Sequence, residues 1–434
     1  TDVHMEKDGT LKVAVNEGIV EGFKVKGNVK TKDYVVTREM KLKKGEPFNA
    51  KAARRSMQRV YNLGYFEDVN IKLNPGREPN GVEVEISVVE MNTGTFGIGA
   101  GYSNADGFVG MVSIGDKNFR GIGDKINLRW EFGGEDNKNY DFSYTRPWLD
   151  DKETSATINL YDITNEYADY NIDGDEIARY DKKRRGQEIT FSRRTHNEFI
   201  SNYITIKNRD DIYKGEADGY EGDENQYYED KFNQSSKYES WMPKTAAERR
   251  KENFGVTRSI TFGRVYDSRD NVYDPHEGKR IGYSVEWAGG MGGDFDFTKW
   301  TADWRYYFRA GGESVWALNL GAGYASGDMP LSQRFTMGGS DTLRGYEDDQ
   351  FRGNSMLKAT LEYRFPIVKK VQGVLFTDNG YAWDKRHEDE FDMGLLKNSY
   401  GVGLRINSPL GPVKLDYGYG EDGGKFHFSF GGQF

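Results

Sequence analysis

Several features on which large classes of protein depend are missing from this chain. None of its 434 residues is cysteine, which excludes disulfide bonds and thiolate metal sites. No run of about eighteen apolar residues occurs, so the sequence contains no transmembrane helix. The net charge of -9 leaves no broad basic surface for nucleic acid. The five histidines lack the spacing of metal ligands, and we therefore expect no metal, no cofactor and no enzymatic activity.

Glycine and aromatic residues, by contrast, are abundant. Glycine occurs 53 times and tyrosine 28 times, and aromatic residues make up 14% of the chain. The mean hydropathy is nevertheless only -0.81. This combination is typical of a transmembrane β-barrel, in which lipid-facing side chains alternate with polar lumen-facing ones and aromatic residues form girdles at the membrane surfaces.

The last ten residues alternate between aromatic and polar or small side chains. The aromatic face carries Phe426, Phe428, Phe430, Gly432 and Phe434. Period-two alternation is typical of a strand with one face out of water. Nothing follows in the sequence to cover this face with protein, which favours a strand that faces lipid. The alternative is an edge strand of a soluble β-sandwich.

From Gly94 onward helical periodicity disappears and strand alternation takes over. Sixteen segments alternate in this way, among them residues 126–132, 281–287, 300–308 and 413–419. An even number of strands is typical of closed outer-membrane barrels. We therefore predict a membrane all-β fold over residues 92–434, a sixteen-stranded antiparallel transmembrane β-barrel whose first and last strands are adjacent.

The connections between these segments alternate between short and long. Short turns are expected at residues 194–197, 309–313, 366–370 and 407–412, and long loops at residues 163–180, 209–254, 327–353 and 384–397. Barrels of this kind have short periplasmic turns and long extracellular loops. Asp169 opens a segment that begins like a calcium-binding loop, but its twelfth position is Tyr180 in place of Glu, so we interpret the segment as a solvated acidic loop.

Residues 16–91 have the pattern of a separate small α+β domain. The expected order is a strand at 19–25, a helix capped by Thr31 or Asp33 that runs to Met40, a helix capped by Asn49 that runs to Leu63, and strands at 66–73 and 82–89. The second helix has one apolar face, formed by Ala53, Met57, Val60 and Tyr61. Residues 1–15 resemble a hairpin around Asp8-Gly9, so we expect the chain to start within a longer protein.

Motifs along the whole chain identify a family. Glu17-Gly18, Gly27-Asn28 and residues 63–66 are similar to the signature of POTRA domains. The barrel half carries further motifs in the family's order: residues 264–270 with Pro275 and Gly278, 338–346, 376–380, 401–405, 409–412, 416–418, and a carboxy-terminal β-signal with Glu421, Gly423, Phe426 and Phe428. The chain thus resembles the carboxy-terminal part of BamA-type outer-membrane assembly proteins. One departure is Leu343, which stands where valine is more usual.

The resemblance implies a domain organisation and a location. Residues 16–91 would be a POTRA domain, residues 1–15 the end of a preceding one, and residues 92–434 the barrel. The protein would lie in the bacterial outer membrane, with its POTRA domain in the periplasm. The resemblance also marks residues 343–346 as the family's signature loop, namely Leu343, Arg344, Gly345 and Tyr346.

In the family the arginine of this loop pairs with acidic groups on the inner wall of the barrel. Parity places Glu362 and Asp378 on the polar faces of two strands, and we predict that these carboxylates bind Arg344. A guanidinium group is suited to this because it presents several donors in a rigid fork. The alternative is that Arg344 is a solvated loop residue.

The function implied by the resemblance is the folding and insertion of β-barrel proteins into the outer membrane. The first and last strands would form a seam that opens laterally, because glycine weakens strand pairing. The residues expected at this seam and in the β-signal are Gly97, Gly99, Gly101, Gly423, Phe426, Phe428, Gly431, Gly432 and Phe434. The expected partners are unfolded outer-membrane proteins, periplasmic chaperones, accessory lipoproteins and the lipid bilayer.

Two other functions stay open at the level of sequence. One is a two-partner secretion translocator of the same superfamily, which exports polypeptides through the lumen. The other is a passive channel, which the polar lumen would permit but which gives a POTRA domain no role.

Overall fold

The computed structural model describes residues 2–5, 8–14, 17–103, 107–133, 137–170, 176–216, 254–272, 274–383, 393–408, 411–421 and 423–430. The chain divides into two compact units, one of residues 1–96 with 114–127 and the other of residues 97–113 with 128–434. Within the described part of the chain, no helix has both the length and the apolar character needed to cross a membrane.

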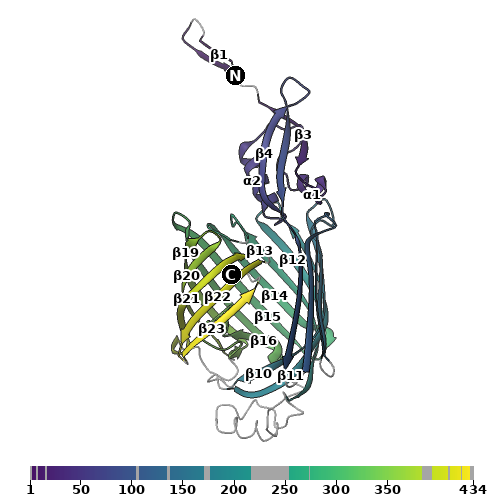
Figure 1. The fold of residues 1–434 in the computed structure, drawn as a ribbon, viewed down its shortest axis with the longest axis vertical. Helices are drawn as coiled ribbons and strands as arrows, with labels where there is room; N and C mark the ends of the chain where they lie inside the picture. The colour runs from purple at the N-terminus through teal and green to yellow at the C-terminus, as the bar shows by residue number, and fades with distance from the viewer. Residues whose placement is uncertain are drawn as a thin grey trace. The chain divides into compact units, whose positions relative to one another are not determined.

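The first unit contains a three-stranded sheet with two helices (Figure 1). Strand β5 (Gly81–Glu90) is central, parallel to β3 (Ile19–Lys26) and antiparallel to β4 (Phe66–Pro75). Helices α1 (Asp33–Thr37) and α2 (Ala50–Tyr61) precede β4 in the chain. The buried core unites both helices and the sheet: Val20, Val35, Val36, Leu42, Ala53, Val60, Tyr65, Phe66, Val84, Ile86 and Val88. The predicted β-α-α-β-β order is confirmed.

Helix α2 starts at the predicted cap but buries a different face. The side chain of Asn49 accepts hydrogen bonds from the backbone N–H groups of Lys51 and Ala52. The predicted apolar face was wrong at Tyr61, which is 41% exposed. Ser56 and Arg59 are buried along with Ala53 and Val60, because polar partners compensate them. The Ser56 hydroxyl accepts from the Lys41 N–H, and Arg59 forms an ion pair with buried Glu39 at 2.7 Å.

Helix α1 is shorter than predicted, and neither expected residue caps it. It ends at Thr37, and Lys32 occupies the N-cap position without a side-chain hydrogen bond. Thr31 instead accepts a hydrogen bond at its hydroxyl from the Asn118 amide, at 2.8 Å, so its side chain is used in a longer-range contact. Before this domain, β1 (Asp2–Met5) and β2 (Leu11–Ala14) form a separate antiparallel hairpin, with Gly9 in a left-handed conformation.

The largest sheet is antiparallel and has sixteen strands, which confirms the predicted number and fold class. Its first eight strands are β6 (Gly94–Ser103), β7 (Gly107–Phe119), β8 (Asp124–Gly133), β9 (Asn137–Arg146), β10 (Thr154–Tyr170), β11 (Glu176–Arg194), β12 (Ile200–Glu216) and β13 (Gly255–Asp267). The other eight are β14 (Gly278–Gly293), β15 (Phe297–Gly311), β16 (Ser314–Gly327), β19 (Ser355–Val368), β20 (Val371–Trp383), β21 (Lys397–Ser408), β22 (Gly411–Gly420) and β23 (Gly423–Phe430).

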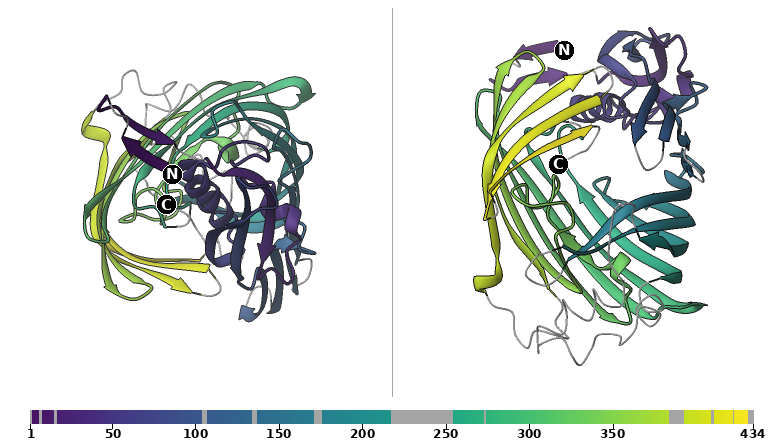
Figure 2. Two further views of the ribbon diagram at one scale, coloured as in Figure 1. Left: turned by 90° about the horizontal axis from the view of Figure 1, so that it is seen from above. Right: turned by 60° about the horizontal axis from the view of Figure 1, so that its bottom comes forward.

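Each strand of this sheet pairs with its neighbours in the chain, with one exception. Strand β16 pairs with β19, because β17 (Phe335–Met337) and β18 (Phe351–Gly353) form a small sheet of their own. The strands are tilted and the sheet curls round into a wall, as Figure 2 shows. Strands β23 and β6 end the order, and no pairing between them is found among the described residues. Closure of the barrel by these two strands therefore stays a prediction.

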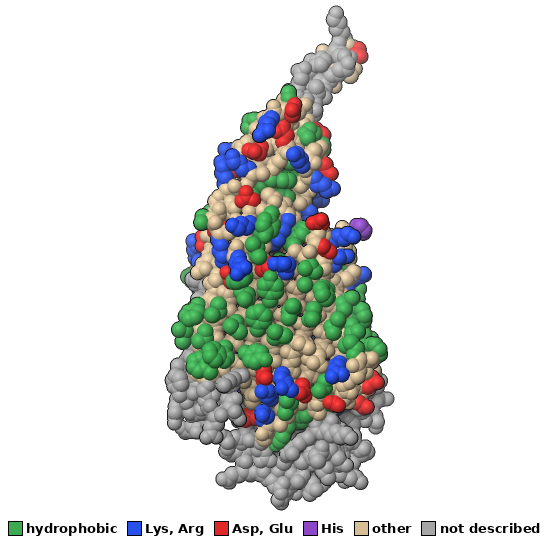
Figure 3. Space-filling view, turned by 90° about the vertical axis from the view of Figure 1, so that its right-hand side faces the viewer, with side chains coloured by type: hydrophobic (Ala, Val, Ile, Leu, Met, Phe, Trp, Pro, Cys, Tyr) green, Lys and Arg blue, Asp and Glu red, His purple; other side chains and the backbone are tan. Residues whose placement is uncertain are grey.

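The outer face of the wall is apolar. Hydrophobic side chains form a broad band in Figure 3, with charged side chains on both sides of it. Outward residues at about half exposure include Phe262, Tyr283, Trp287, Tyr324 and Leu375. A band of this kind is stable only when lipid covers it, because monomeric proteins in water rarely expose apolar patches larger than a few hundred Å². The polar side chains of the same strands point to the concave face.

The described connections differ in part from the predicted loops. Residues 163–180 are mostly strand, since β10 and β11 stay paired as far as Tyr170 and Glu176. Beyond the lipid a strand pair needs no apolar face, so its alternation signal fades while the hydrogen-bonded ladder continues. The solvated acidic loop predicted from Asp169 onward is shorter than expected, because Asp169 lies in β10 and Tyr180 in β11; residues 171–175 between the two strands lie outside the described residues.

The loops predicted at 209–254 and 384–397 lie only partly in the described residues. Strand β12 extends to Glu216, and residues 217–253 lie outside the described chain. A short 3-10 helix η2 (Met393–Leu395) precedes β21, while residues 384–392 also lie outside it. The loop predicted at 327–353 is ordered by β17, β18 and a 3-10 helix η1 (Leu331–Gln333).

Candidate functional site

The β16–β19 loop (residues 328–354) carries the candidate site. Its tight turns use glycine where the backbone requires it, since Gly338 and Gly339 have positive φ angles of 121° and 87°. Between them and β18 lie Leu343 and Tyr346, which are 0% and 1% exposed. They pack in a small core with Met337, Phe351, Tyr381 and Ala382. The loop is thus folded around its own apolar residues, and this fixes the position of Arg344.

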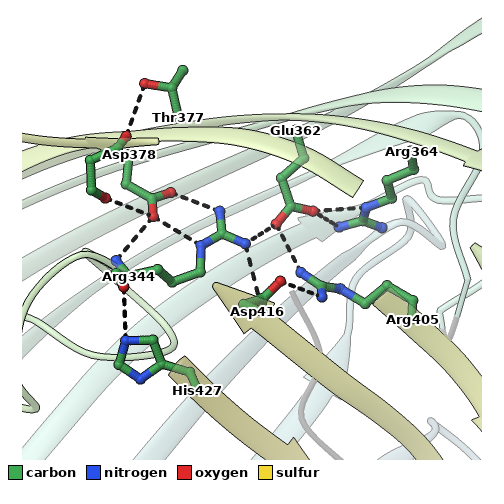
Figure 4. Close-up of polar contacts among 9 residues, drawn as sticks. Arg344, Glu362, Arg364, Thr377, Asp378, Arg405, Asp416 and His427 are labelled. Atoms are coloured by element: carbon green, nitrogen blue, oxygen red, sulfur yellow. Dashed lines mark hydrogen bonds and ion pairs between the residues drawn. The ribbon is translucent and has the colours of Figure 1, made fainter. Parts of the chain in front are cut away.

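Arg344 points at the inner face of β19 and β20 (Figure 4). Its Nε and Nη2 donate to the two carboxylate oxygens of Asp378, at 2.9 and 2.8 Å. Its Nη1 donates to Glu362 Oε1 at 2.6 Å, and its backbone N–H also donates to Asp378 at 3.1 Å. The guanidinium carbon lies 3.4 Å from the centre of the Phe376 ring. Such bidentate and stacked contacts require arginine, because a lysine ammonium is a single point charge.

The carboxylates around Arg344 are shared with two further arginines. Arg405 donates to Asp416 at 2.7 Å and to Glu362 at 3.2 Å. Arg364 donates to the other oxygen of Glu362 at 2.9 Å. We call these six residues the Arg344 cluster: Arg344, Arg364, Arg405, Glu362, Asp378 and Asp416. Three positive and three negative charges balance, and none of the six side chains exceeds 11% exposure.

The loop also contacts the last two strands, β22 and β23. The carbonyl oxygen of Arg344 lies 2.9 Å from His427 Nε2 in β23, and Lys425 in the same strand forms an ion pair with Glu347. Gly418 in β22 permits this approach, because a Cβ at that position would lie 2.3 Å from the Arg344 carbonyl oxygen. The loop therefore holds the strand that carries the predicted β-signal.

The mid-barrel motif forms a separate structure in the turn between β13 and β14. Arg269 is 6% exposed and donates two hydrogen bonds, of 2.9 and 2.7 Å, to the carboxylate of Asp267. Asp270 accepts from the backbone N–H groups of Asn271 and His276. Gly278 closes the turn at a φ of 102°, where a Cβ would lie 2.4 Å from the Ser268 carbonyl oxygen. The motif thus builds a tight turn, and the contacts of Arg269, Asp270 and Gly278 explain these residue types locally.

The structure brings some of the predicted site residues together and separates others. Arg344, Glu362 and Asp378 meet directly, as described above. Gly97, Gly99 and Gly101 lie in β6, and Gly423, Phe426 and Phe428 lie in β23, at the two ends of the sheet. Phe426 and Phe428 are 66% and 63% exposed on the outer face. Gly431, Gly432 and Phe434 lie outside the described residues.

Sequence reasoning missed four members of this site, Arg364, Arg405, Asp416 and His427. All four stand on polar faces of alternating strands, and Arg405 and Asp416 lie within recognised motifs. Parity alone marks every inward residue equally, so it gave no reason to choose these four. No group of three metal-binding side chains is found in the described part of the chain. The arrangement is suited to holding a loop against a wall by charge-assisted hydrogen bonds.

Comparison with known proteins places this fold and site in a family. The model described as the Omp85 superfamily domain matches residues 118–434, and the POTRA model, described as a surface antigen variable number repeat, matches residues 19–91. The chain belongs to the Omp85 superfamily. It is an outer-membrane β-barrel protein with a periplasmic POTRA domain, as the sequence predicted.

Individual relatives refine this comparison. The outer membrane protein assembly factor BamA of Nitratidesulfovibrio vulgaris is 30% identical over 447 residues, which cover 97% of this chain and 51% of that protein. The chain spans about half the length of the curated relatives it matches, at 51%, 54% and 54%.

Two solved structures share the fold. BamA from Haemophilus ducreyi lacking POTRA domains 1–3 has a TM-score of 0.55 at 20% identity, covering 98% of this chain and 88% of that one. CdiB from Escherichia coli has a TM-score of 0.64 at 13% identity, covering 98% and 79%.

Proposed function

We propose that this protein folds β-barrel proteins and inserts them into the outer membrane. The observation that carries the proposal is the pair of sheet ends, β6 and β23, which are not paired with each other in the described residues. The 30% identity to an outer membrane protein assembly factor over 97% of the chain supports it. A strand entering hydrocarbon must have its backbone N–H and C=O groups hydrogen-bonded, and an unpaired strand edge offers those partners.

The seam between β6 and β23 is the functional edge in this proposal. Three glycines in β6 remove side chains that would pack against a partner strand, so pairing there is weak. Client strands would add to the exposed edge by β-augmentation. The Arg344 cluster would serve this mechanism by holding the loop, and through it β23, in a fixed position on the inner face. No nucleotide is required, because the free energy comes from folding of the client.

The second candidate is a polypeptide translocator, which the fold similarity to CdiB favours. In that function the client would pass through the lumen and would need the β16–β19 loop to leave it. The contacts of Arg344 with Glu362 and Asp378 weigh against easy displacement, because both buried carboxylates would lose this cation when the loop leaves. Insertion through the seam leaves these contacts in place.

The partners follow from the proposal. Unfolded outer-membrane proteins and the lipid bilayer are required by the reaction itself. Periplasmic chaperones would deliver the clients, and accessory lipoproteins would bind the periplasmic part of the protein. Of the two outer strands of the POTRA sheet, β3 is bonded at its start to residues 45–48, so β4 offers the more open edge for such contacts within the described sheet.

Reconstitution tests the proposal against its alternative. The protein is placed in liposomes, and a urea-unfolded eight-stranded outer-membrane barrel is added outside by dilution. We expect the client to fold into the bilayer faster than in protein-free liposomes, as measured by the heat-modifiable mobility of folded barrels in gels. A client that appears inside the vesicles, protected from added protease, would indicate translocation instead. Absence of both effects would contradict the proposed function.

A further inference from the structure

The β16–β19 loop has a second anchor, at its start. The 3-10 helix η1 places Ser332 and Gln333 against the inner face of four consecutive strands, β12 to β15. We call this group the Gln333 anchor, and it consists of Ser332, Gln333, Lys207, Arg209, Asp211, Thr257, Glu286 and Lys299. It shares no residue with the Arg344 cluster, and no motif of the sequence includes Gln333.

Gln333 uses its side chain and its backbone in this anchor. Its Nε2 donates to the hydroxyl of Thr257, which is fully buried, and its Oε1 accepts from Lys207 Nζ at 3.1 Å. Its backbone carbonyl accepts from Lys299 Nζ at 2.6 Å. Gln333 itself is only 6% exposed. Both the nitrogen and the oxygen of the side-chain amide thus have a hydrogen-bond partner on the strand wall. Loss of these partners would leave buried polar atoms unsatisfied.

Ser332 extends the anchor along β12. Its hydroxyl donates to Asp211 at 2.9 Å, and Arg209 donates to its carbonyl oxygen at 3.2 Å. The loop also contacts Lys299 at the first residue of β17, since Lys299 Nζ lies 4.3 Å from the centre of the Phe335 ring. Lys299 therefore contacts the loop twice, at a carbonyl oxygen and at an aromatic face.

The charges of the wall explain why the loop binds here. The wall part of the anchor has three cations, Lys207, Arg209 and Lys299, and two carboxylates, Asp211 and Glu286. One positive charge is in excess. The loop brings no carboxylate to this place but supplies neutral oxygen acceptors, two of them backbone carbonyls. Hydrogen bonds from a cation to such oxygens are stronger than neutral ones, so the excess charge is stabilised by the bound loop.

We propose that Gln333 and Lys299 are positioning residues that fix the start of the loop. The loop is then held on β12–β15 by the Gln333 anchor and on β19–β22 by the Arg344 cluster, and it reaches β23 through the contacts of Arg344 with His427 and of Glu347 with Lys425. Because β16 connects these two groups of strands, the loop braces ten consecutive strands from within. This deepens the proposed function, in which the loop must hold β23 steady beside the seam.

Hydrogen exchange of the purified protein in lipid nanodiscs tests the proposal without any client. In Lys299→Met and Gln333→Leu we expect the amides of residues 329–337 to exchange at least about tenfold faster, through local opening of the loop start. Ser332→Ala, which removes one hydroxyl only, should give a smaller increase in the same segment. Lys299→Arg should restore slow exchange, because a guanidinium also reaches the carbonyl of Gln333.

The matched control is Lys183→Met. Lys183 also belongs to the strand wall, but it pairs with the wall carboxylate Asp162 at 2.9 Å and not with the loop. It should leave exchange at residues 329–337 unchanged. An unchanged rate in Lys299→Met and Gln333→Leu, or an increase spread evenly over all strands, would overturn the proposal. If the exchange result holds while clients fail to fold in the liposome assay, the anchor stands and the proposed function falls.

Discussion

Arg344 is the residue on which the site depends, and its role was predictable because two independent signals agreed. The loop motif marked the arginine, and strand parity placed Glu362 and Asp378 on polar faces. The remaining members of the cluster were not singled out, because parity cannot distinguish among the many inward residues of sixteen strands. No sequence pattern marked Gln333 as a site residue. It lies in a loop and in no motif, and its contacts use a side-chain amide and a backbone carbonyl, which do not distinguish it from other polar loop residues.

Replacing Arg344 tests the electrostatic account of the loop. Arg344→Ala leaves Glu362 and Asp378 buried with one cation fewer, and we expect the loop to lose about 3–5 kcal/mol of stabilisation. Hydrogen exchange at residues 338–350 should rise strongly, and assembly of client barrels should fall. Arg344→Lys should give an intermediate effect, because it retains the charge but loses the two parallel hydrogen bonds to Asp378. Equal behaviour of Arg344→Ala and the parent would refute this account.

Gly418 tests the close approach of the loop to β22. In Gly418→Ala the new Cβ would lie 2.3 Å from the Arg344 carbonyl oxygen, which is backbone and cannot rotate away. We expect the loop to be displaced, at a cost of about 1–3 kcal/mol typical of overpacking. Gly282→Ala in β14 is the matched control, because its Cβ would meet nothing closer than 3.7 Å. Melting temperatures and loop exchange of the two variants should differ; matching values would show that the approach does not matter.

At the scale of elements, the sequence predicted strands well where lipid demands alternation and poorly where it does not. Apolar alternation marked the membrane-facing part of each strand, whereas the extensions of β10 and β11 have polar residues on both faces and were assigned to a loop. The α2 cap at Asn49 was predicted from a local rule and found in place. The buried face of α2 was not predicted correctly, because the burial of Ser56 and Arg59 depends on partners distant in the sequence.

The connection at residues 28–33 of the POTRA domain should be sensitive to acid. Glu90 accepts hydrogen bonds from the backbone N–H groups of Lys30 and Thr31, at 2.9 and 2.7 Å. Partial burial alone would raise the pKa of Glu90, but the hydrogen bonds from Lys30 and Thr31 outweigh it and hold the pKa below its ordinary value of 4.5. A lowered pKa in the folded state means that this contribution to stability is complete above pH 4.5 and is lost as pH falls through the folded pKa.

Exchange measured across this pH range checks the prediction. Amides of residues 28–33 should become less protected as pH falls below 4.5, after correction for the intrinsic pH dependence of exchange. Glu90→Gln should remove most of this extra pH dependence, because its amide does not titrate. Glu78→Gln is a suitable control, since the Glu78 carboxylate has no part in the contacts of Lys30 and Thr31. A parental profile that matches the profile of Glu90→Gln would contradict the assignment.

At the scale of the whole molecule, the number of strands was predictable but the state of the seam was not. Sixteen alternating segments gave sixteen strands, since each membrane crossing needs its own apolar face. Whether β6 pairs with β23 depends on a balance between weak glycine-rich pairing and the exposed edges that it would cover, and period-two patterns contain no information on that balance. The proposed function depends on this seam more than on any other feature.

The most direct measurement locks the seam and asks whether assembly stops. One cysteine is placed in β6 and one in β23, and the absence of native cysteine means that only the engineered disulfide forms. A second protein carries Tyr283→Cys with Ala302→Cys, which are partners in the β14–β15 ladder far along the sheet from the seam. In the liposome assay we predict that oxidation of the seam pair slows client folding at least about tenfold, that reductant restores it, and that the control pair has no effect. Client folding at the parental rate with the seam fully oxidised would contradict the claim that the seam opens during insertion.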